Sequence, residues 1–340
     1  MNIIENSKIL VINTAFLGDI ALTAFLTQKI KNKYKCNISV LTTIAGAEVL
    51  SSIKSIDSMF ILDKKSTHKS LSDSIDFAKS LSAYNFNIII SLHKSFRTSV
   101  IVKNIDADLK IGFDVSSRSN VYNKKIKYKS HYHEVERYIS TMFEDLKLEI
   151  VELEISENDK LYVDNLLIQQ KYDENKKTVV LASGSVWNTK KWGDQNFINL
   201  ANLLKENYNV LFIGGKDDSI DNLKGTINLY GKTNISQSYY LLSLSNLIVT
   251  NDSAPTHFAS IVNIPTITIF GATHPYFGFG PLADNSLIIQ NETLECRPCR
   301  IHGSDVCPLG TLECMNSIRP EKVAQQVETI ITNINSETYQ

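Results

Sequence analysis

The stretch Asn246-Leu247-Ile248-Val249-Thr250-Asn251-Asp252-Ser253-Ala254-Pro255-Thr256-His257 decides how this chain folds. Its apolar first half predicts a buried β-strand, and the proline at position 255 favours the first turn of a helix. The first N–H groups of a helix have no partner within it and the helix dipole is positive there, so a helix start attracts anions. The stretch therefore predicts an α/β sheet with a diphosphate-binding loop at its carboxyl edge. An ordinary strand-to-helix crossover fits the same pattern.

Two side chains in this stretch need separate interpretation. A carboxylate repels a diphosphate, so we expect Asp252 to cap the helix and to fix the loop. His257 lies one turn into the helix, where it either donates to a phosphate or packs in the core.

Small, basic and acidic residues follow two other predicted strands. After Thr178–Ala182 come Ser183-Gly184-Ser185 and then Lys190-Lys191, which supply backbone amides, hydroxyls and positive charge for a diphosphate. A solvated basic turn is the alternative. After Asn209–Ile213 comes Gly214-Gly215-Lys216-Asp217-Asp218, where an acidic side chain can accept hydrogen bonds from ribose hydroxyls.

Short β-branched runs alternate with longer amphipathic stretches along the chain, which is typical of parallel α/β sheets. The first half predicts strands at Lys8–Asn13, Asn37–Thr42, Met59–Leu62 and Asn87–Leu92, and helices at Asp19–Tyr34, Ala45–Ser52, Lys69–Tyr84 and Ser95–Asn104. The second half predicts strands at Thr178–Ala182, Asn209–Ile213, Asn246–Thr250 and Pro265–Phe270, and helices at Asp194–Asn207, Gln237–Ser243 and Pro255–Val262. Because the pattern restarts, we expect two doubly wound domains.

The polar stretch Ser156–Lys177 separates the two halves and predicts a helix that ends in a charged linker. We place the boundary near residue 175, so that residues 1–174 form an amino-terminal domain and residues 175–319 a carboxy-terminal domain. The last segment, 320–340, is amphipathic and begins with a proline that favours a helix start, and we expect it to pack back across the hinge. A chain of 340 residues with 43% hydrophobic content can bury two such cores.

The net charge of −1 hides an uneven distribution. Residues 1–150 hold 21 Lys and Arg against 15 Asp and Glu (21 − 15 = +6), whereas residues 151–340 hold 14 against 21 (14 − 21 = −7). The basic half suits an anionic acceptor or a phosphate-bearing membrane surface, and a solvated lysine-rich surface is the alternative. No signal peptide or membrane span is evident, so we expect a cytoplasmic protein with peripheral contact to the inner membrane and no nucleic-acid partner.

A carboxylate also follows the first predicted strand, in the run Thr14-Ala15-Phe16-Leu17-Gly18-Asp19. At this edge of the sheet Asp19 is a candidate general base for an acceptor hydroxyl. The preference of aspartate for a helix amino terminus explains the residue equally well.

In this order and at these separations, the motifs resemble glycosyltransferase family 9, the ADP-heptose:lipopolysaccharide heptosyltransferases. The residues that carry the resemblance span most of the chain and are Leu17-Gly18-Asp19, Lys190-Lys191-Trp192, Gly214-Gly215, Thr250–His257 and Phe270-Gly271-Ala272-Thr273-His274-Pro275. The resemblance implies an α/β fold of the GT-B type, in which two Rossmann-like, doubly wound domains face a central cleft. It also implies an inverting, metal-independent transfer of heptose from an ADP-heptose donor to a lipopolysaccharide inner-core acceptor.

The resemblance further implies roles for individual residues. Asp19 is the catalytic base, and Lys190 with the helix start at Pro255 holds the diphosphate. The other residues expected around the nucleotide-sugar are Gly18, Ser183, Ser185, Lys191, Asp217, Asp218, Asp252, Ser253, Ala254 and His257. The residues expected to bind the carboxylates and phosphates of an anionic glycolipid acceptor are His93, Lys94 and Arg97, together with Arg118, Lys124, Lys125, Lys127 and Lys129.

Three positions depart from the family pattern. Ala254 stands where glycine is usual, Phe25 replaces a proline, and Ala182-Ser183-Gly184-Ser185 replaces a His-Pro-Gly-Ala type of turn. Because donor loops are affected, three alternatives stay open. They are a family-9 transferase with another donor sugar or a protein acceptor, a GT-B nucleotide-sugar epimerase, and a non-catalytic nucleotide-sugar-binding paralogue. The presence of both Asp19 and Lys190 argues against the paralogue.

Four of the five cysteines fall in the pattern Cys296-x2-Cys299-x7-Cys307-x6-Cys314. Thiolates at this spacing can close a tetrahedral site around zinc or iron, whereas disulfides are disfavoured in the cytoplasm. The segment resembles in outline the iron-binding cysteine finger of some autotransporter heptosyltransferases. We expect a structural metal, with buried free thiols as the alternative. Four cysteine ligands leave no open coordination position, so we expect no catalysis at this site, and the family resemblance implies that the transfer itself needs no cofactor.

Overall fold

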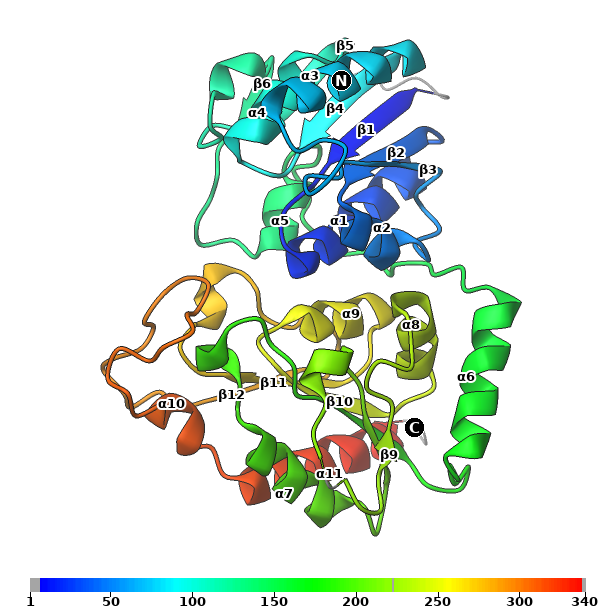
Figure 1. The fold of residues 1–340 in the computed structure, drawn as a ribbon, viewed down its shortest axis with the longest axis vertical. Coiled ribbons are helices and arrows are strands. Elements are labelled where there is room, and N and C mark those ends of the chain that lie inside the picture. The colour runs from blue at the N-terminus through cyan, green and yellow to red at the C-terminus, as the bar shows by residue number, and fades with distance from the viewer. Residues whose placement is uncertain (1–6, 222, 338–340) are drawn as a thin grey trace. The chain divides into compact units, whose positions relative to one another are not determined.

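The computed structural model describes residues 7–221 and 223–337. The chain forms two compact units, the first ending at Glu154 and the second beginning at Ile155 (Figure 1). Each unit holds one parallel sheet with helices on its faces, so the predicted α/β class and the two doubly wound sheets are confirmed.

The first unit is built on a six-stranded sheet in the order β3-β2-β1-β4-β5-β6. Its described strands are β1 (Lys8–Ile12), β2 (Asn37–Thr42), β3 (Ser58–Ile61), β4 (Phe86–Ser91), β5 (Ala107–Phe113) and β6 (Lys124–Ile126). Its described helices are α1 (Leu17–Lys33), α2 (Ile44–Leu50), α3 (Leu71–Leu81), α4 (Phe96–Lys103) and α5 (Glu134–Ile139). The strand order reverses at β1, so the loops after β1 and β4 lie at the switch point where α/β sheets bind ligands.

The second unit repeats this plan with the strand order β12-β11-β10-β7-β8-β9. Its described strands are β7 (Thr178–Ala182), β8 (Asn209–Phe212), β9 (Ile227–Asn228), β10 (Leu247–Asn251), β11 (Thr266–Phe270) and β12 (Leu287–Gln290). Its described helices are α6 (Glu157–Gln169), α7 (Asp194–Leu204), α8 (Ile235–Ser243), α9 (Ala254–Val262), α10 (Glu313–Asn316) and α11 (Pro320–Glu337). Here the switch point lies between β7 and β10, which are the strands before the two predicted diphosphate loops.

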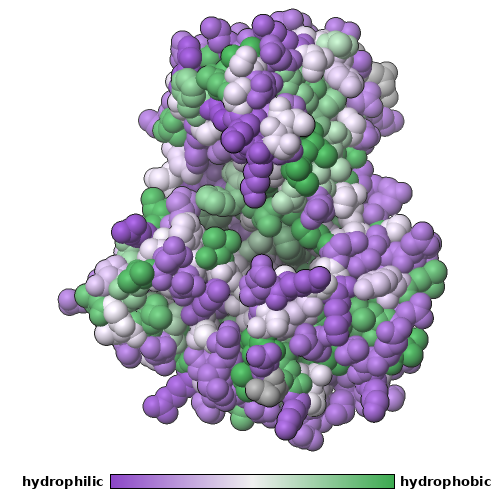
Figure 2. All heavy atoms as spheres, viewed as in Figure 1, coloured by the Kyte–Doolittle hydropathy of each residue, from purple (hydrophilic) through white to green (hydrophobic). Residues whose placement is uncertain are grey.

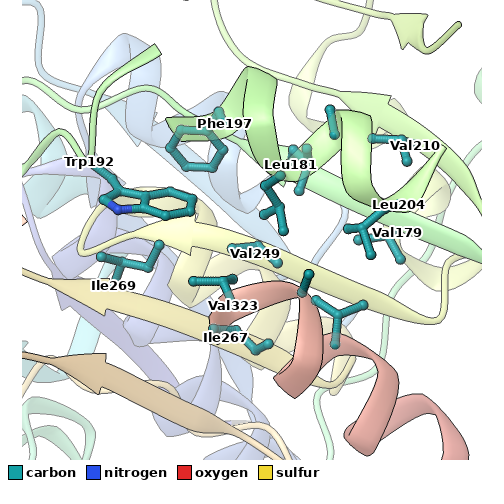
Figure 3. Close-up of a cluster of buried hydrophobic side chains, with 14 of the residues drawn as sticks. Val179, Leu181, Trp192, Phe197, Leu204, Val210, Val249, Ile267, Ile269 and Val323 are labelled. Atoms are coloured by element: carbon teal, nitrogen blue, oxygen red, sulfur yellow. The ribbon is translucent and has the colours of Figure 1, made fainter. Parts of the chain in front are cut away.

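The core of the second unit explains why its strands form where they do. All residues of β7, β10 and β11 are buried, as continuous apolar runs in a parallel sheet covered on both faces must be. Figure 3 shows Leu181 and Val249 from the sheet facing Trp192 and Phe197, whose rings meet edge to face with centroids 5.1 Å apart.

The carboxy-terminal helix α11 belongs to this core. Its Val323 and Val327 are fully buried in the same cluster, and the helix packs against α7 (Figure 3). The helix predicted from Pro320 is therefore present, and its apolar face is covered by the second unit. Its packing back across the hinge stays a prediction.

The two units divide after Glu154, earlier than the predicted boundary near residue 175. The backbone N–H of Lys54 donates to Glu152 (3.0 Å), which holds the chain to the first unit up to this point. Helix α6 then packs on α8, where the Asp159 carboxylate accepts hydrogen bonds from Ser236 (3.0 Å) and Gln237 (2.9 Å). Asp159, a polar residue of the stretch that suggested a linker, therefore anchors this helix to α8.

The face of each unit seen in Figure 2 is mainly hydrophilic. Apolar side chains are scattered between the hydrophilic ones. Within residues 7–221 and 223–337, none of the helices is both long enough and apolar enough to cross a membrane.

Candidate functional site

The loops after β7 and β10 are joined by one buried amide side chain. Asn251, fully buried at the end of β10, donates from Nδ2 to the Ser183 carbonyl (2.6 Å) and accepts at Oδ1 from the backbone N–H of Trp192 (3.0 Å). Asn251 is therefore hydrogen-bonded to both ends of the loop that carries Lys190, at Ser183 and at Trp192. Sequence reasoning did not assign Asn251 a contact of its own.

Asp252 brings a third loop into the same site. Its Oδ2 lies 2.7 Å from Lys190 Nζ and accepts a hydrogen bond from the Thr273 hydroxyl (2.6 Å). The Asp252 side chain is 6% exposed and that of Lys190 is 14% exposed, so this ion pair is largely shielded from water. Lys190, predicted to face a diphosphate, thus stands beside a carboxylate and the loop after β11.

The prediction that Asp252 caps α9 is wrong, although the prediction that it fixes the loop is confirmed. Helix α9 has Ser253 as its N-cap, and no side chain within the described residues caps it. The backbone of Asp252 continues the hydrogen bonding of β10 to β11, because its N–H donates to the Ile269 carbonyl (3.1 Å). Its side chain therefore lies beside Lys190 and does not cap the helix. Because no side chain caps it, the positive end of α9 is available to an anion.

The start of α9 shows where the remaining residues of the motif lie. Thr256 donates from its hydroxyl to the Asn251 carbonyl (3.0 Å), which fixes the helix to the end of β10. Ala254 is the first helical residue and is half-buried, so its methyl group fits the backbone without strain. His257 is 4% exposed, with its ring centroid 6.2 Å from that of Phe279. It is a buried side chain in the first turn, and a contact with phosphate stays a prediction.

Asp217 and Asp218, the two acidic candidates for ribose binding in the loop after β8, differ in their contacts and exposure. The Asp218 carboxylate accepts a hydrogen bond from the Gly215 N–H (2.9 Å), and a Cβ atom at Gly184 would lie 2.5 Å from it. Asp218 is therefore engaged within the protein, and glycine at 184 is what lets the two loops approach. Asp217 is exposed, which makes it the better placed of the two for a ribose hydroxyl.

The small residues after β7 fall into two groups. The Ser183 hydroxyl is buried and hydrogen-bonded to the Tyr230 hydroxyl, a partner that the sequence motifs did not include. Burial raises the pKa of Tyr230 well above its ordinary value, so the phenol stays neutral. Ser185 and Lys191 are half-buried at the same edge of the sheet.

In the first unit, Asp19 lies in the first turn of α1 beside a buried polar cluster. Asn13 is fully buried and donates from Nδ2 to the Asp19 carbonyl (3.0 Å), the Thr23 hydroxyl (3.0 Å) and the Tyr138 hydroxyl (3.3 Å). Burial first, and then the negative charges of Glu134 and Asp19, raise the pKa of Tyr138 well above its ordinary value. Asp19 and its neighbour Gly18 are half-buried, and the helix dipole favours a charged carboxylate there.

The three predicted acceptor residues all have partners within the first unit. His93 contacts the Thr14 hydroxyl (2.9 Å) through Nδ1. Burial, Lys64 and Lys94 lower the pKa of His93 to about 4, so its imidazole is neutral at pH 7. Arg97 donates to the carbonyl groups of His68 and Lys69 (both 2.9 Å).

Lys94 and its neighbours form the charged part of this edge. Lys94 Nζ lies 3.7 Å from the buried Glu134 carboxylate and 3.9 Å from the centre of the Tyr128 ring. Glu134 also pairs with the buried Arg137. Both cations among the three predicted acceptor residues are therefore partly occupied, Lys94 by a carboxylate and Arg97 by carbonyl groups.

Lys64 is a further cation at this edge that sequence reasoning missed. It follows β3, and its Nζ donates to the Thr14 carbonyl (2.6 Å). Burial, and then the charge of Arg97, lower the pKa of Lys64. A lysine two residues after a buried Leu62 at a strand end was the available signal. The other predicted cations, Arg118, Lys124, Lys125, Lys127 and Lys129, are exposed around β5 and β6.

The four cysteines of the carboxy-terminal cluster line one pocket of about 260 Å³, in the orange loop between β12 and α10 (Figure 1). None of the four forms a disulfide with another described residue, and Cys314 is buried. Hydrogen bonds from the backbone N–H groups of residues 309–312 lower the pKa of Cys307. Within the described residues no three His, Cys, Asp or Glu side chains are placed to hold a metal ion. The fifth, Cys36, is a buried core residue, as expected.

The sequence matches the model of a known family. Residues 75–308 fit the family model described as "Glycosyltransferase family 9 (heptosyltransferase)", which is more than half of the chain. This chain belongs to glycosyltransferase family 9. The resemblance drawn from its motifs is thereby confirmed, and the transferase class with it.

Similar proteins agree with this assignment. A Campylobacter jejuni protein named "Lipooligosaccharide heptosyltransferase 2" is 28% identical over 266 residues, covering 72% of this chain and 76% of that protein. Among solved structures, a family-9 glycosyl transferase from Veillonella parvula has a TM-score of 0.85 at 21% identity, covering 97% of this chain and 98% of that one. The Escherichia coli ADP-heptose lipopolysaccharide heptosyltransferase II has a TM-score of 0.78 at 20% identity, covering 96% and 99%. The fold of this family-9 transferase is therefore of the GT-B type, as predicted.

Proposed function

We propose that this family-9 transferase moves a heptose from ADP-heptose to an anionic inner-core acceptor of lipopolysaccharide, with inversion at the anomeric carbon. The observation that carries the proposal is the convergence of the Lys190 ammonium group and the uncapped start of α9 at one edge of the second sheet. Charge that develops on a departing diphosphate is stabilised by donors of this kind. The names of similar proteins, which include an ADP-heptose enzyme, support the choice of donor.

The donor side of the mechanism follows from the contacts of Lys190. Before the donor binds, the Asp252 carboxylate and the Thr273 hydroxyl hold the site together (2.7 Å and 2.6 Å). The diphosphate takes the ammonium group as its counter-ion, while Thr273 continues to satisfy Asp252. Asp217 accepts a hydrogen bond from a ribose hydroxyl.

The acceptor side uses the edge of the first sheet. Asp19 takes the proton of an acceptor hydroxyl, whose oxygen forms a bond to the anomeric carbon while the bond from that carbon to the diphosphate oxygen breaks. The bonding electrons leave with ADP, and no metal is required. Lys64 and Lys94 bind carboxylate or phosphate groups of the acceptor, and the exposed cations around β5 and β6 hold the enzyme at the cytoplasmic face of the inner membrane.

The identity of the nucleotide is the first test. Titration calorimetry with ADP and UDP is expected to show binding of ADP and at least about tenfold weaker binding of UDP, a difference of about 1.4 kcal/mol. A transfer assay with ADP-heptose and a deacylated inner-core acceptor should then give a product with inverted configuration. Preferential binding of UDP would exclude the heptose assignment. Release of an isomerised donor without acceptor would show an epimerase instead.

We also propose that the four clustered cysteines hold a structural zinc or iron ion. All four line one pocket, and backbone amides favour the thiolate of Cys307, which is the form that binds metal. Because no three of the described ligand groups are positioned to bind an ion, the side chains must converge around it. The ion has no part in the transfer reaction.

Metal analysis by mass spectrometry tests this second proposal directly. We expect the purified protein to carry about one zinc or iron ion per chain, as a Cys₄ site does. The variant with both Cys299→Ser and Cys307→Ser is expected to lose the metal, whereas Cys36→Ala is expected to keep it. A metal-free protein that takes up neither ion after reduction and reconstitution would establish four free thiols.

A further inference from the structure

Arg297 lies inside the cysteine-rich segment and holds the loop that follows β11. Its half-buried guanidinium group donates from Nε to the Gly271 carbonyl and from Nη2 to the Thr273 carbonyl (3.0 Å). It also donates to the Asn291 carbonyl and to the Gln290 side chain (2.9 Å). One planar fork therefore joins the ends of two neighbouring strands, β11 and β12.

The loop that Arg297 holds is the loop that completes the donor site. Thr273 donates its hydroxyl to Asp252, and Asp252 pairs with Lys190. The next residues of the same segment add a backbone bond, since the Cys299 N–H donates to the Ala272 carbonyl (2.8 Å). A displacement of Arg297 would therefore reach Lys190 through three successive contacts, Arg297 with Thr273, Thr273 with Asp252 and Asp252 with Lys190.

A second connection reaches Lys190 directly through its neighbour in the chain. The Thr189 backbone N–H and hydroxyl both donate to the Ser304 carbonyl (3.0 and 2.8 Å), and the Ser304 N–H donates back to that hydroxyl (2.9 Å). The adjacent Gly303 is buried, and a Cβ atom there would lie 3.1 Å from Lys190 Cγ. The segment thus packs on the stem of the lysine side chain as well.

We infer that the segment from Cys296 to Cys314 is a positioning element of the donor site, with Arg297 as its main positioning residue. The segment holds the loops around Lys190 and Thr273 in place, so that donor affinity depends on it although it does not touch the reacting atoms. Arginine is required because a planar guanidinium can donate to several diverging carbonyl groups, whereas an ammonium group is a single compact donor. The inference rests on the proposed donor only for the choice of ADP as ligand.

The packing of the segment shows why its role is more than structural support. Between β12 and α10 it has no strand or α-helix, and most of its residues are exposed. Its hydrogen bonds to the 189 and 271–273 loops therefore contribute to its order, and the same bonds contribute to the order of those loops. The cysteine-rich segment and the loops around residues 189 and 271–273 are therefore expected to become disordered together.

Two variants and one control test this inference. Arg297→Lys keeps the charge and removes the fork, and Thr189→Val removes the hydroxyl bonds to Ser304 with little change in shape. Arg300→Met serves as the control, since Arg300 is an exposed arginine of the same segment. The measurements are the melting temperature, the hydrogen exchange of amides 189–191 and 271–274 without ligand, and the dissociation constant for ADP.

We expect Arg297→Lys to weaken ADP binding about tenfold and Thr189→Val about threefold, in line with the loss of one or two hydrogen bonds each. Exchange of the 271–274 amides should accelerate in Arg297→Lys, while Arg300→Met should match the wild type. Unchanged exchange and ADP affinity in both folded variants would overturn the inference. If the wild type itself does not bind ADP, the donor assignment fails, and exchange at 271–274 still decides whether Arg297 positions the loop.

Discussion

Asp19→Asn is expected to reduce the transfer rate by at least about a hundredfold, because an amide cannot accept the proton of the acceptor hydroxyl. Asparagine has nearly the same shape as aspartate, so the contact of Asn13 Nδ2 with the carbonyl of residue 19 is retained. The favourable interaction of the charge with the helix start is lost, at about 0.5 kcal/mol. The measurements are kcat with ADP-heptose and acceptor, and the melting temperature.

The matched control is Asp76→Asn, which removes a carboxylate from the exposed face of α3 and should leave kcat unchanged. ADP affinity should also stay within about twofold of the wild type in Asp19→Asn, because the donor residues lie in the second sheet. Near-full turnover by a folded Asp19→Asn protein would show that another group takes the proton. A loss of ADP affinity would instead place Asp19 in donor binding.

Much of the fold could be predicted from the sequence because its central strands carry strong signals. The runs that became β1, β7 and β10 are mainly apolar and almost entirely buried, as expected for strands covered on both faces. The strands that were missed are mostly at or near sheet edges. β6 is Lys124-Lys125-Ile126, whose charged side chains give no strand pattern, and β9 has two residues.

The site could be predicted only where a contact depends on local sequence. The helix start after Ser253 followed from Pro255, because the preference of proline for a first turn is local, but the absence of a side-chain cap did not follow from the sequence. Asp252 was interpreted as the helix cap, although Ser253 holds the N-cap position. Its actual partner, Lys190, could not be identified because it is far away in the sequence. Arg297 gave no signal at all, since its acceptors are backbone carbonyl groups that every residue possesses.

Lys190→Met is the second change with a large expected effect, and it acts on both activity and stability. Without the ammonium group the leaving diphosphate loses a charge partner, so kcat should fall about a hundredfold and ADP should bind at least about tenfold more weakly. The Asp252 carboxylate, whose side chain is 6% exposed, keeps only its bond from Thr273. Removing one partner of a shielded pair is costly, and we expect a loss of about 2 kcal/mol in the free energy of unfolding.

The double variant Lys190→Met with Asp252→Asn separates the two effects. The asparagine carries no charge that needs a partner, so the double variant should recover most of the lost stability. It should not recover the transfer rate, because the diphosphate still lacks its cation. Denaturant unfolding and kcat measured on the two single variants and the double variant give both results. If restored stability brought the rate back, Lys190 would act by neutralising Asp252, and the charge that helps the diphosphate to depart would have to come from α9 alone.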